Sequence, residues 1–504
     1  MRKIPATMAT QHPDNASTPY WGSSPFISTL EEVDECFRVF SDLDCDEYMW
    51  DWEGKFVDEA VVDRLFHRYA DYFKKRQLGR DKFLTFRIPN IWEETGFRLA
   101  RSYMTIITAS HSAREHGFHV PPIFEVILPM TTSARQLLTI LKKYLEAVKY
   151  GKAIFDERIG GEDQLELIPL IEGGVTLFHS RKILRDYVAG YQKLKKRRPS
   201  YLRPFIARSD PALDAGFVSA VLSARGAISE YYRFSEESGI PVYPIIGVGA
   251  LPFRGGLSPA GLNRFLKTYA GVRTVTIQSA HRYDFPVAEV RRMIHHLKRE
   301  LPRRDPALFG DAELREMTRF SNLFSSIYRP TITQLAPAIN DIARFVPSHR
   351  ERIPHTGHFG YSRRVGKNRT RMPRAIAFVA SLASLGIPPT LIGTGRGLRE
   401  IVKRHQEKAL LSYLPTLPLD LELAGNYFNR ENLKFLIRGD SAWMPVLEDV
   451  EFIEVFLGKR LGPEKPEHYI HRNLTSIIYH LWKGKKKEVT EEILHAGRIR
   501  RSLG

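Results

Sequence analysis

Short apolar segments recur along this chain at a regular spacing, and this recurrence limits the possible folds more than any other feature. Each segment is rich in β-branched and aromatic residues, and successive segments start about forty residues apart. Continuous apolar runs of this length are typical of strands in a parallel sheet, which are buried on both faces. The predicted strands are Asp44–Glu53, Phe83–Pro89, Ile123–Met130, Leu165–Glu172, Arg203–Asp210, Val242–Gly249 and Thr274–Ser279.

The stretches between these strands carry apolar residues at helical spacing. Clear examples are 57–75, 133–151, 180–196 and 258–271, and the last three begin with Ser, which is a favourable N-cap residue. Alternating strands and helices predict parallel strands joined by crossover helices.

An eighth apolar segment, Pro389–Gly395, follows a long insertion. Eight strands match a (β/α)₈ TIM-type barrel better than an open sheet, so we expect an α/β barrel with additional, mostly helical insertions. The expected layout is a single elaborated barrel domain over 1–504, with an N-terminal segment 1–43 that carries His12, the barrel over 44–398 with an insertion at about 297–388, and a helical C-terminal region over 399–504.

The composition fits a globular protein. With 43% apolar and 26% charged residues the chain can bury a large core, and no apolar run approaches the ~20 residues that span a bilayer. The first residues lack the apolar stretch of a secretory signal, so we expect a cytoplasmic protein without a membrane partner. Cys36 and Cys45 are too few for a disulfide framework or a four-thiolate metal site.

The formal charge of +18 raises a competing hypothesis, a nucleic-acid-binding protein. The densest basic runs are 193–198 and 483–487. Both lie at expected helix ends without interleaved aromatic residues, which favours a solvated surface over a nucleic-acid interface.

Two carboxylates each end a predicted apolar strand, Glu172 in LIPLIEGG and Asp210 in IARSDPALDAG. In a barrel of this kind the carboxyl ends of the strands carry the active site. A Mg²⁺ or Mn²⁺ ion typically takes one or two protein carboxylates and leaves its other positions for water and an anionic substrate. The alternative, which the pattern leaves open, is that both residues cap the helices that follow.

Several arginines suggest an anionic ligand. In LPFRGGLSP, Arg254 precedes two glycines and a Ser-Pro that starts a helix, an arrangement suited to a phosphate or carboxylate, although a plain tight turn would look the same. Other arginines lie close to glycines or to strand ends: Arg208, Arg282, Arg363, Arg374 and Arg396. Near the N-terminus, His12 in ATQHPDN is a candidate for proton transfer, but a lone histidine is more often structural.

From ATQHPDN onward the chain closely resembles the archaeal-type phosphoenolpyruvate carboxylases. The likeness continues through MWDWEGK, IPLIEGG, ARSDPALDAG, LPFRGGLSP, PRAIAF, IPPTLIGTGR and the final RRSLG, so it spans essentially the whole chain. Larger bacterial and plant carboxylases show related patterns, and the residues of those patterns map onto His12, Glu172, Asp210, Arg254, Arg374 and Gly504.

The resemblance implies a Mg²⁺- or Mn²⁺-dependent homotetramer that forms oxaloacetate and phosphate from phosphoenolpyruvate and bicarbonate, through carboxyphosphate and a metal-stabilised enolate. It implies no nucleic-acid partner. The implied metal ligands are Glu172 and Asp210, the implied catalytic residues are His12, Arg254 and Arg374, and the implied substrate-binding residues are Arg208, Arg282, Arg363 and Arg396.

The chain departs from the large-enzyme pattern at three positions. Leu213 replaces the lysine of SDS-x-KDAG, and Ile246 and Val248 replace the histidine and first arginine of FHGRGG. The bicarbonate contacts must therefore differ, with Arg208, Arg282 or Arg363 as candidates. A rival interpretation is another metal-dependent barrel lyase or aldolase that acts on pyruvate-like substrates, and bicarbonate dependence would separate the two.

Overall fold

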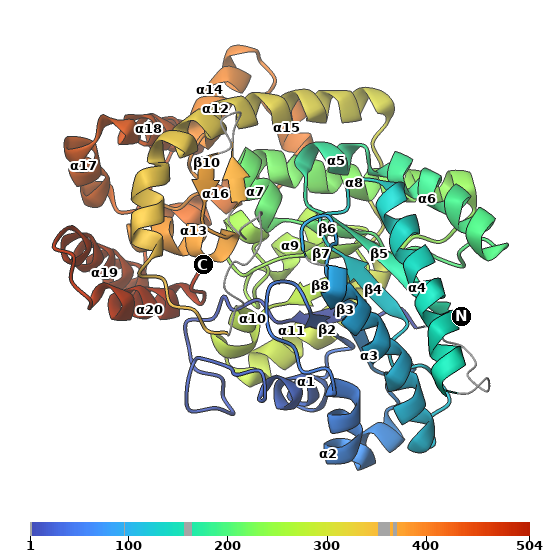
Figure 1. Ribbon diagram of the computed structural model, residues 1–504. Coiled ribbons are helices and arrows are strands. Elements are labelled where there is room, and N and C mark those ends of the chain that lie inside the picture. The colour runs from blue at the N-terminus through green and yellow to red at the C-terminus, as the bar shows by residue number, and fades with distance from the viewer. Residues whose placement is uncertain (1–2, 95, 156–163, 351–362, 366–369) are drawn as a thin grey trace.

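The computed structural model describes residues 3–94, 96–155, 164–350, 363–365 and 370–504, and its centre is a closed barrel of eight parallel strands (Figure 1). The strands follow one another around the barrel in chain order, and β8 returns to β1 with Thr7 opposite Val275. The predicted (β/α)₈ barrel is confirmed. The strands are β1 (Thr7–Thr10), β2 (Glu47–Asp51), β3 (Phe83–Arg87), β4 (Glu125–Leu128), β5 (Glu166–Ile171), β6 (Phe205–Ala207), β7 (Ile245–Gly247) and β8 (Thr274–Ile277).

Seven strands fall within the predicted segments, but the eighth does not. The prediction of a strand at Pro389–Gly395 is wrong, because the chain turns there and enters helix α14 (Thr394–Lys403). The missing strand is β1, which lies within the N-terminal segment 1–43. Leu391 and Ile392 are nevertheless buried, in the large hydrophobic cluster outside the barrel lumen. Their apolar character reflects burial against helices rather than a place in the sheet.

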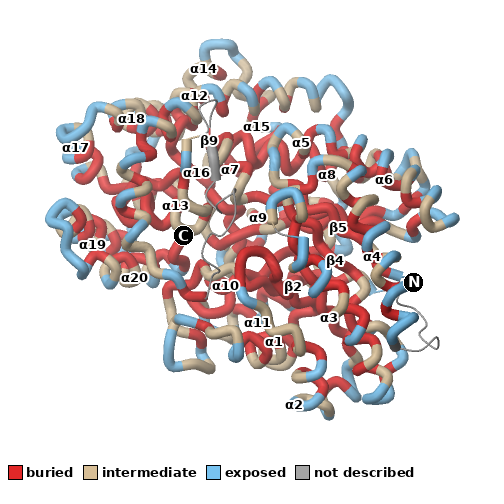
Figure 2. Tube along the Cα trace, in the orientation of Figure 1, coloured by how far each residue is buried: buried red, intermediate tan, exposed pale blue. Residues whose placement is uncertain are grey.

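The barrel has two separate apolar layers. A small cluster that includes Met8, Met49 and Ile168 fills the lumen, while the outward-facing residues join the large cluster beneath the helices. At the amino-terminal end of the strands the buried Arg203 contacts Glu47 at 2.7 Å and also contacts Glu125. Figure 2 shows the strands as the most continuously buried part of the chain.

One or two helices occupy each connection between barrel strands, as the helical periodicity predicts, and two more helices follow β8. These helices are α1 (Glu32–Ser41), α2 (Val61–Lys75), α3 (Gly96–Glu115), α4 (Ala134–Phe155), α5 (Gly174–Phe178), α6 (Ser180–Lys195), α7 (Ser209–Ala215), α8 (Phe217–Ser238), α9 (Leu262–Thr268), α10 (Ser279–Tyr283) and α11 (Val287–Glu300). The short helices α5, α7 and α10 directly follow strands β5, β6 and β8. They therefore mark the carboxyl end of the barrel.

The rest of the chain is mostly helical and lies beside that end (Figure 1). The 33-residue helix α12 packs against α7 and α8 on the barrel side and against α13 and α14 on the other side. The remaining elements are α12 (Asp311–Ala343), β9 (Arg363–Val365), β10 (Thr370–Met372), α13 (Ala375–Ser384), α15 (Glu407–Tyr413), α16 (Leu417–Gly425), α17 (Arg430–Gly439), α18 (Met444–Leu457), α19 (Pro466–Lys483), α20 (Val489–Arg500) and the 3₁₀ turns η2 (Pro252–Arg254), η3 (Leu301–Arg303) and η4 (Ser441–Trp443).

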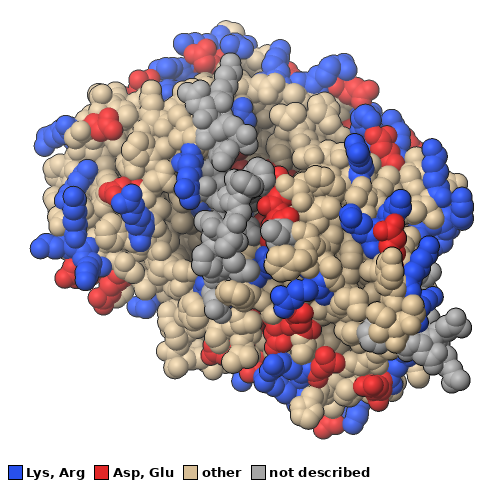
Figure 3. Space-filling model, viewed as in Figure 1, with Lys and Arg blue, Asp and Glu red and all other residues tan. Residues whose placement is uncertain are grey.

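The composition raised two classes of partner, a membrane and a nucleic acid, and the helices and the surface charge relate to them. Within the described ranges, no helix combines the length and the apolar character needed to cross a bilayer. Figure 3 shows Lys and Arg scattered over the visible face, with Asp and Glu among them.

Candidate active site

A cavity of about 750 Å³ opens at the carboxyl end of the barrel. Its walls come from two parts of the fold. Strand ends and the turns that follow them supply one wall, and residues 340–348 and 371–377 of the insertion supply the other. Six of the residues predicted from the sequence line this cavity: His12, Glu172, Arg208, Asp210, Arg254 and Arg374.

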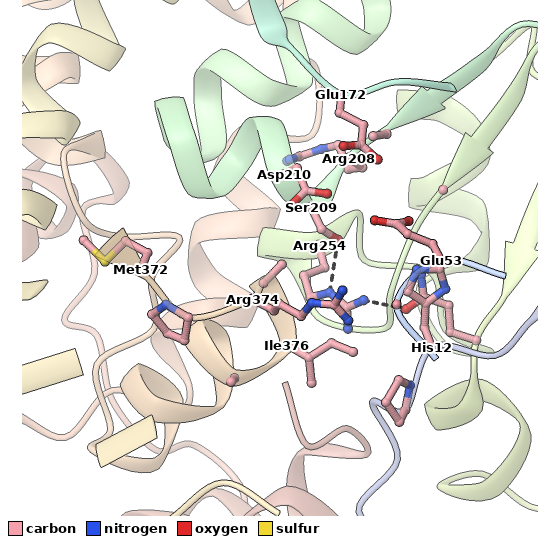
Figure 4. Close-up of a pocket in the computed structure, with 18 of the residues that line it drawn as sticks. His12, Glu53, Glu172, Arg208, Ser209, Asp210, Arg254, Met372, Arg374 and Ile376 are labelled. Carbon is pink, nitrogen blue, oxygen red and sulfur yellow. Dashed lines mark hydrogen bonds between the residues drawn. The ribbon is translucent and has the colours of Figure 1, made fainter. Parts of the chain in front are cut away.

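Glu172 and Asp210 enter the cavity from neighbouring strands. Glu172 directly follows β5, and Asp210 lies in the first turn of α7 after β6. Strands β5 and β6 pair with each other, so the two carboxylates reach the same end of the barrel (Figure 4). This placement agrees with the geometry that the strand-end rule predicts.

Arg254 lines the cavity and is almost completely buried. Its Nη1 donates to Asp14 Oδ2 at 2.8 Å and to the carbonyl oxygen of Gly504. Its Nη2 donates to Gln278 Oε1 at 2.6 Å, and its Nε donates to Ser209 Oγ at 3.1 Å. The protein itself therefore occupies most of the donor capacity of this guanidinium. The sequence suggests that Arg254 contacts an anionic substrate, and a bidentate contact would require some of these bonds to break.

Arg208 also lines the cavity, and it is fully buried. Its Nε donates to the Tyr269 hydroxyl at 2.9 Å, its Nη2 donates to the Phe217 carbonyl, and its guanidinium lies over the Phe217 ring. Among the described residues its Nη1 has no hydrogen-bond partner. A buried cation in this position favours anions in the adjacent cavity.

His12 follows β1 and lies at the carboxyl end of the barrel because β1 is a barrel strand. Its Nδ1 is 2.9 Å from the hydroxyl oxygen of the buried Thr10. A hydrogen bond to one ring nitrogen orients the imidazole, and the hydroxyl can serve either tautomer because it both donates and accepts. The side chain is half-buried at the wall opposite the insertion.

Two of the predicted arginines have other positions, and the structure does not describe the side chain of a third. Arg282 is fully buried outside the cavity and donates to Glu35 Oε1 at 2.8 Å. Burial opposes ionisation of Glu35, but Arg350 and Arg282 lower the pKa of that carboxyl to about 2. Arg396 binds the buried Asp449 at 2.8 Å, again outside the cavity. Arg363 opens β9, and its side chain lies outside what the structure describes.

A family model described as phosphoenolpyruvate carboxylase matches residues 4–504. The chain belongs to the phosphoenolpyruvate carboxylase family. It is 39% identical to the phosphoenolpyruvate carboxylase of Leuconostoc mesenteroides over 505 residues, which cover 100% of this chain and 99% of that protein. It is 39% identical to that of Metallosphaera sedula over 100% of both chains, and 40% identical to that of Pyrococcus horikoshii over 84% of this chain and 89% of that protein. The family resemblance seen in the motifs is confirmed.

The cavity of this carboxylase family member also contains residues that the sequence analysis did not assign to the site. Arg87 ends β3, and it donates to Asp51 Oδ2 at 2.6 Å and contacts Glu53 at 2.9 Å. Burial opposes the charge of Arg87, but Asp51 and Glu53 raise its pKa, and Glu172 adds to that effect. Arg87 lies near the end of an apolar segment that predicts a strand, so the rule that led to Glu172 could also have led to Arg87.

The donor set of this carboxylase cavity fits a divalent metal. Among the described residues no cluster of three or more His, Cys, Asp or Glu side chains could hold an ion, so Glu172 and Asp210 are a pair rather than part of a full cage. Mg²⁺ commonly binds through one or two carboxylates and completes its shell with water and substrate oxygens. Two adjacent carboxylates beside an open cavity meet that requirement.

Proposed function

We propose that this chain carboxylates phosphoenolpyruvate with bicarbonate and releases oxaloacetate and phosphate. The observation that carries the proposal is one cavity, in a member of this family, that holds a carboxylate pair, a histidine and several cationic side chains at the carboxyl end of a barrel. Such an arrangement can bind a polyanionic substrate next to a cation and move a proton beside it.

Glu172 and Asp210 would hold Mg²⁺ or Mn²⁺, with water and substrate oxygens in the remaining positions. When bound, the ion would offset the negative charge that develops on the enolate oxygen of the substrate. The support for this assignment is the pairing of β5 with β6, which brings both carboxylates to one wall of the cavity.

Cationic side chains would hold phosphoenolpyruvate and bicarbonate in line. Arg374, at the start of α13, Arg87, at the end of β3, and the buried Arg208 all line the cavity. A bicarbonate oxygen would attack phosphorus, and the bond from phosphorus to the enol oxygen would break. The products of this step are carboxyphosphate and the enolate of pyruvate. Fixed arginines favour such a step because they keep both anions at reacting distance.

His12 would act in the second half of the reaction. It would accept the proton of the carboxyphosphate carboxyl group, so that the bond from carbon to the bridging oxygen breaks to give CO₂ and phosphate. The enolate carbon then adds to CO₂ and forms oxaloacetate. The contact between His12 and Thr10 supports this role, because it leaves the imidazole oriented at the cavity wall.

The homotetramer and the cytoplasmic location stay predictions. Ile470 and Ile477 are exposed on α19, and their spacing of seven residues places them on one face of the helix. Exposed apolar patches often mark protein–protein contacts, so this face would suit a subunit interface. Sedimentation of the purified protein would give the number of subunits.

The test of the proposed function is an assay with phosphoenolpyruvate, bicarbonate and Mg²⁺ that follows oxaloacetate and phosphate separately. Equal amounts of both products, dependent on bicarbonate, are expected. Turnover of phosphoenolpyruvate or a related keto acid without any requirement for bicarbonate would instead indicate a barrel lyase or aldolase. Absence of oxaloacetate would refute the proposal.

A further inference from the structure

Asp14 makes more connections between separate parts of the fold than its position in a turn requires. Its Oδ2 accepts from Arg254 Nη1 at 2.8 Å, and its Oδ1 accepts from the backbone N–H of Ala280 at 2.8 Å. Its backbone carbonyl accepts from the N–H of Leu503 at 2.7 Å and from Ser502 Oγ at 3.3 Å. The side chain is completely buried.

The turn that contains Asp14 also carries His12. The N–H of Asp14 donates to the carbonyl oxygen of His12 at 3.0 Å, and the same oxygen accepts from Ser279 at 3.3 Å. Asp14 therefore lies two residues after His12 in the chain. It bonds to the backbone of His12 and, through Ala280, to the start of α10, which also bonds to His12. A shift of the Asp14 carboxylate would move the peptide that positions His12.

The 502–504 segment is the third part that depends on this aspartate. The Gly504 carbonyl accepts from Arg254, and Arg254 is itself held by Asp14. Gly504 lies so close to α13 that an added β-carbon would be 2.2 Å from the carbonyl oxygen of Ile376. Because Ile376 lines the cavity, the 502–504 segment supports the back of one cavity wall.

We infer that Asp14 is a positioning residue that holds Arg254, the His12 turn and the 502–504 segment as one unit, and so protects the enolate and CO₂ from water until they combine. The inference rests on the proposed function. Asp14 contacts neither reactant itself. Its effect should appear in the second half of the reaction, where a loosened wall would let water protonate the enolate to pyruvate.

The charge of Asp14, rather than its size, carries this role. A carboxylate offers acceptor oxygens to both Arg254 and Ala280, whereas an amide has one acceptor oxygen and would direct its own N–H groups at one of these donors. A buried guanidinium that loses its carboxylate is also left uncompensated, which is strongly unfavourable. Asp14→Asn should therefore disturb the unit while it preserves the volume of the side chain.

Asp284 provides a matched control. It is also a buried aspartate that binds the N-terminal segment, because it accepts from the N–H groups of Ala16 at 2.9 Å and Ser17 at 2.6 Å. It has no contact with Arg254 among those described. Asp284→Asn makes the same chemical change at a second buried aspartate of this region and should leave the Arg254 unit in place.

The experiment measures oxaloacetate and phosphate together for the wild type, Asp14→Asn and Asp284→Asn at saturating phosphoenolpyruvate, bicarbonate and Mg²⁺. The ratio of oxaloacetate to phosphate should fall by about tenfold in Asp14→Asn, as a buried charge-assisted contact is lost. It should stay near the wild-type value in Asp284→Asn. A wild-type ratio in Asp14→Asn, or an equal fall in both variants, would overturn the inference.

A second variant keeps the test decisive. If Asp14→Asn does not fold by circular dichroism, Asp14→Glu replaces it. That variant keeps the charge but cannot match both the Arg254 and Ala280 distances, so its ratio should fall by roughly threefold or more, and an unchanged ratio would count against the inference. If the wild type itself forms no oxaloacetate, the proposed function fails and not the assignment of Asp14 alone.

Discussion

Glu172 and Asp210 follow two strands that pair directly, with Leu170 opposite Phe205 and Ile171 opposite Ile206. The register leaves both carboxylates just beyond the last paired residues, at the wall of the cavity. Neither residue needs an unusual backbone conformation to reach this place. A pair held by a closed barrel is fixed in position before any ion or substrate binds, which lowers the cost of forming the site.

The first prediction is that Glu172→Ala removes carboxylation and weakens binding of Mn²⁺, measured by titration without substrate. The reason is that one of two carboxylate ligands is lost. Asp214→Ala is the matched control, since Asp214 lies on the same helix as Asp210 but pairs with Arg329 outside the cavity. Near-normal activity of Glu172→Ala at limiting Mg²⁺ would contradict the metal assignment.

The second prediction separates the arginines by location. Arg374→Ala should raise the KM for phosphoenolpyruvate or bicarbonate about tenfold or more, or ~1.4 kcal/mol, because a charge-assisted contact to an anion is removed. Arg396→Ala should leave both KM values nearly unchanged and lower the melting temperature, because its partner is the buried Asp449. Steady-state kinetics and thermal melts would check both results. Equal kinetic effects would mean that general positive charge, and not a site, binds the substrates.

The strands could be predicted wherever they are apolar and long enough. β5 reads as ELIPLI, in which a continuous apolar run follows Glu166, and it lies where it was expected. β1 reads as TMAT, which is four residues long with two threonines, and it carries too little pattern to be recognised. It becomes a strand because β2 and β8 on either side of it need a partner to close the barrel. That requirement is tertiary and does not appear in the local sequence.

The arginines show a second limit. Arg282 and Arg254 both follow strands and look alike in the sequence, yet one pairs with Glu35 outside the cavity and the other lines it. Glu35 lies far from Arg282 in the chain, so the sequence around Arg282 does not predict this ion pair. A short distance to glycine or to a strand end indicates where an arginine lies along the barrel but not which way its guanidinium points.

The third prediction concerns pH. Burial raises the pKa of Asp284 to about 7, despite the N–H groups of Ala16 and Ser17 that bind its carboxylate. In the unfolded chain the pKa of an aspartate is about 3.9. The stabilising contribution of this raised pKa is therefore fully present below about pH 4 and is lost as the pH rises through about 7. Asp284→Asn, which resembles the protonated form, should not lose it.

Thermal melts of the wild type and Asp284→Asn from pH 5 to pH 8 would check this prediction. The difference in melting temperature should move in favour of the variant as the pH rises. Because other groups titrate in both proteins, only the difference is diagnostic. A constant difference over this range would show that Asp284 titrates at its ordinary pKa.

The fourth prediction concerns His12, whose role in proton transfer distinguishes the two halves of the reaction. In His12→Asn, bicarbonate can still attack phosphorus because the arginines and the carboxylate pair are unchanged. Carboxyphosphate then has no base to accept its carboxyl proton, so CO₂ is not formed and the enolate is protonated to pyruvate. The expected signature is phosphate release that depends on bicarbonate, with pyruvate in place of oxaloacetate.

Phosphate, pyruvate and oxaloacetate should be measured in the same sample, with circular dichroism to confirm that the variant is folded. His405→Asn is the matched control, because His405 is exposed, lies outside the cavity and has a φ of 54°, which asparagine tolerates well. It should retain the wild-type ratio of products. A normal yield of oxaloacetate per phosphate in His12→Asn would mean that His12 is structural, held by Thr10 for the closure of the barrel rather than for the movement of a proton.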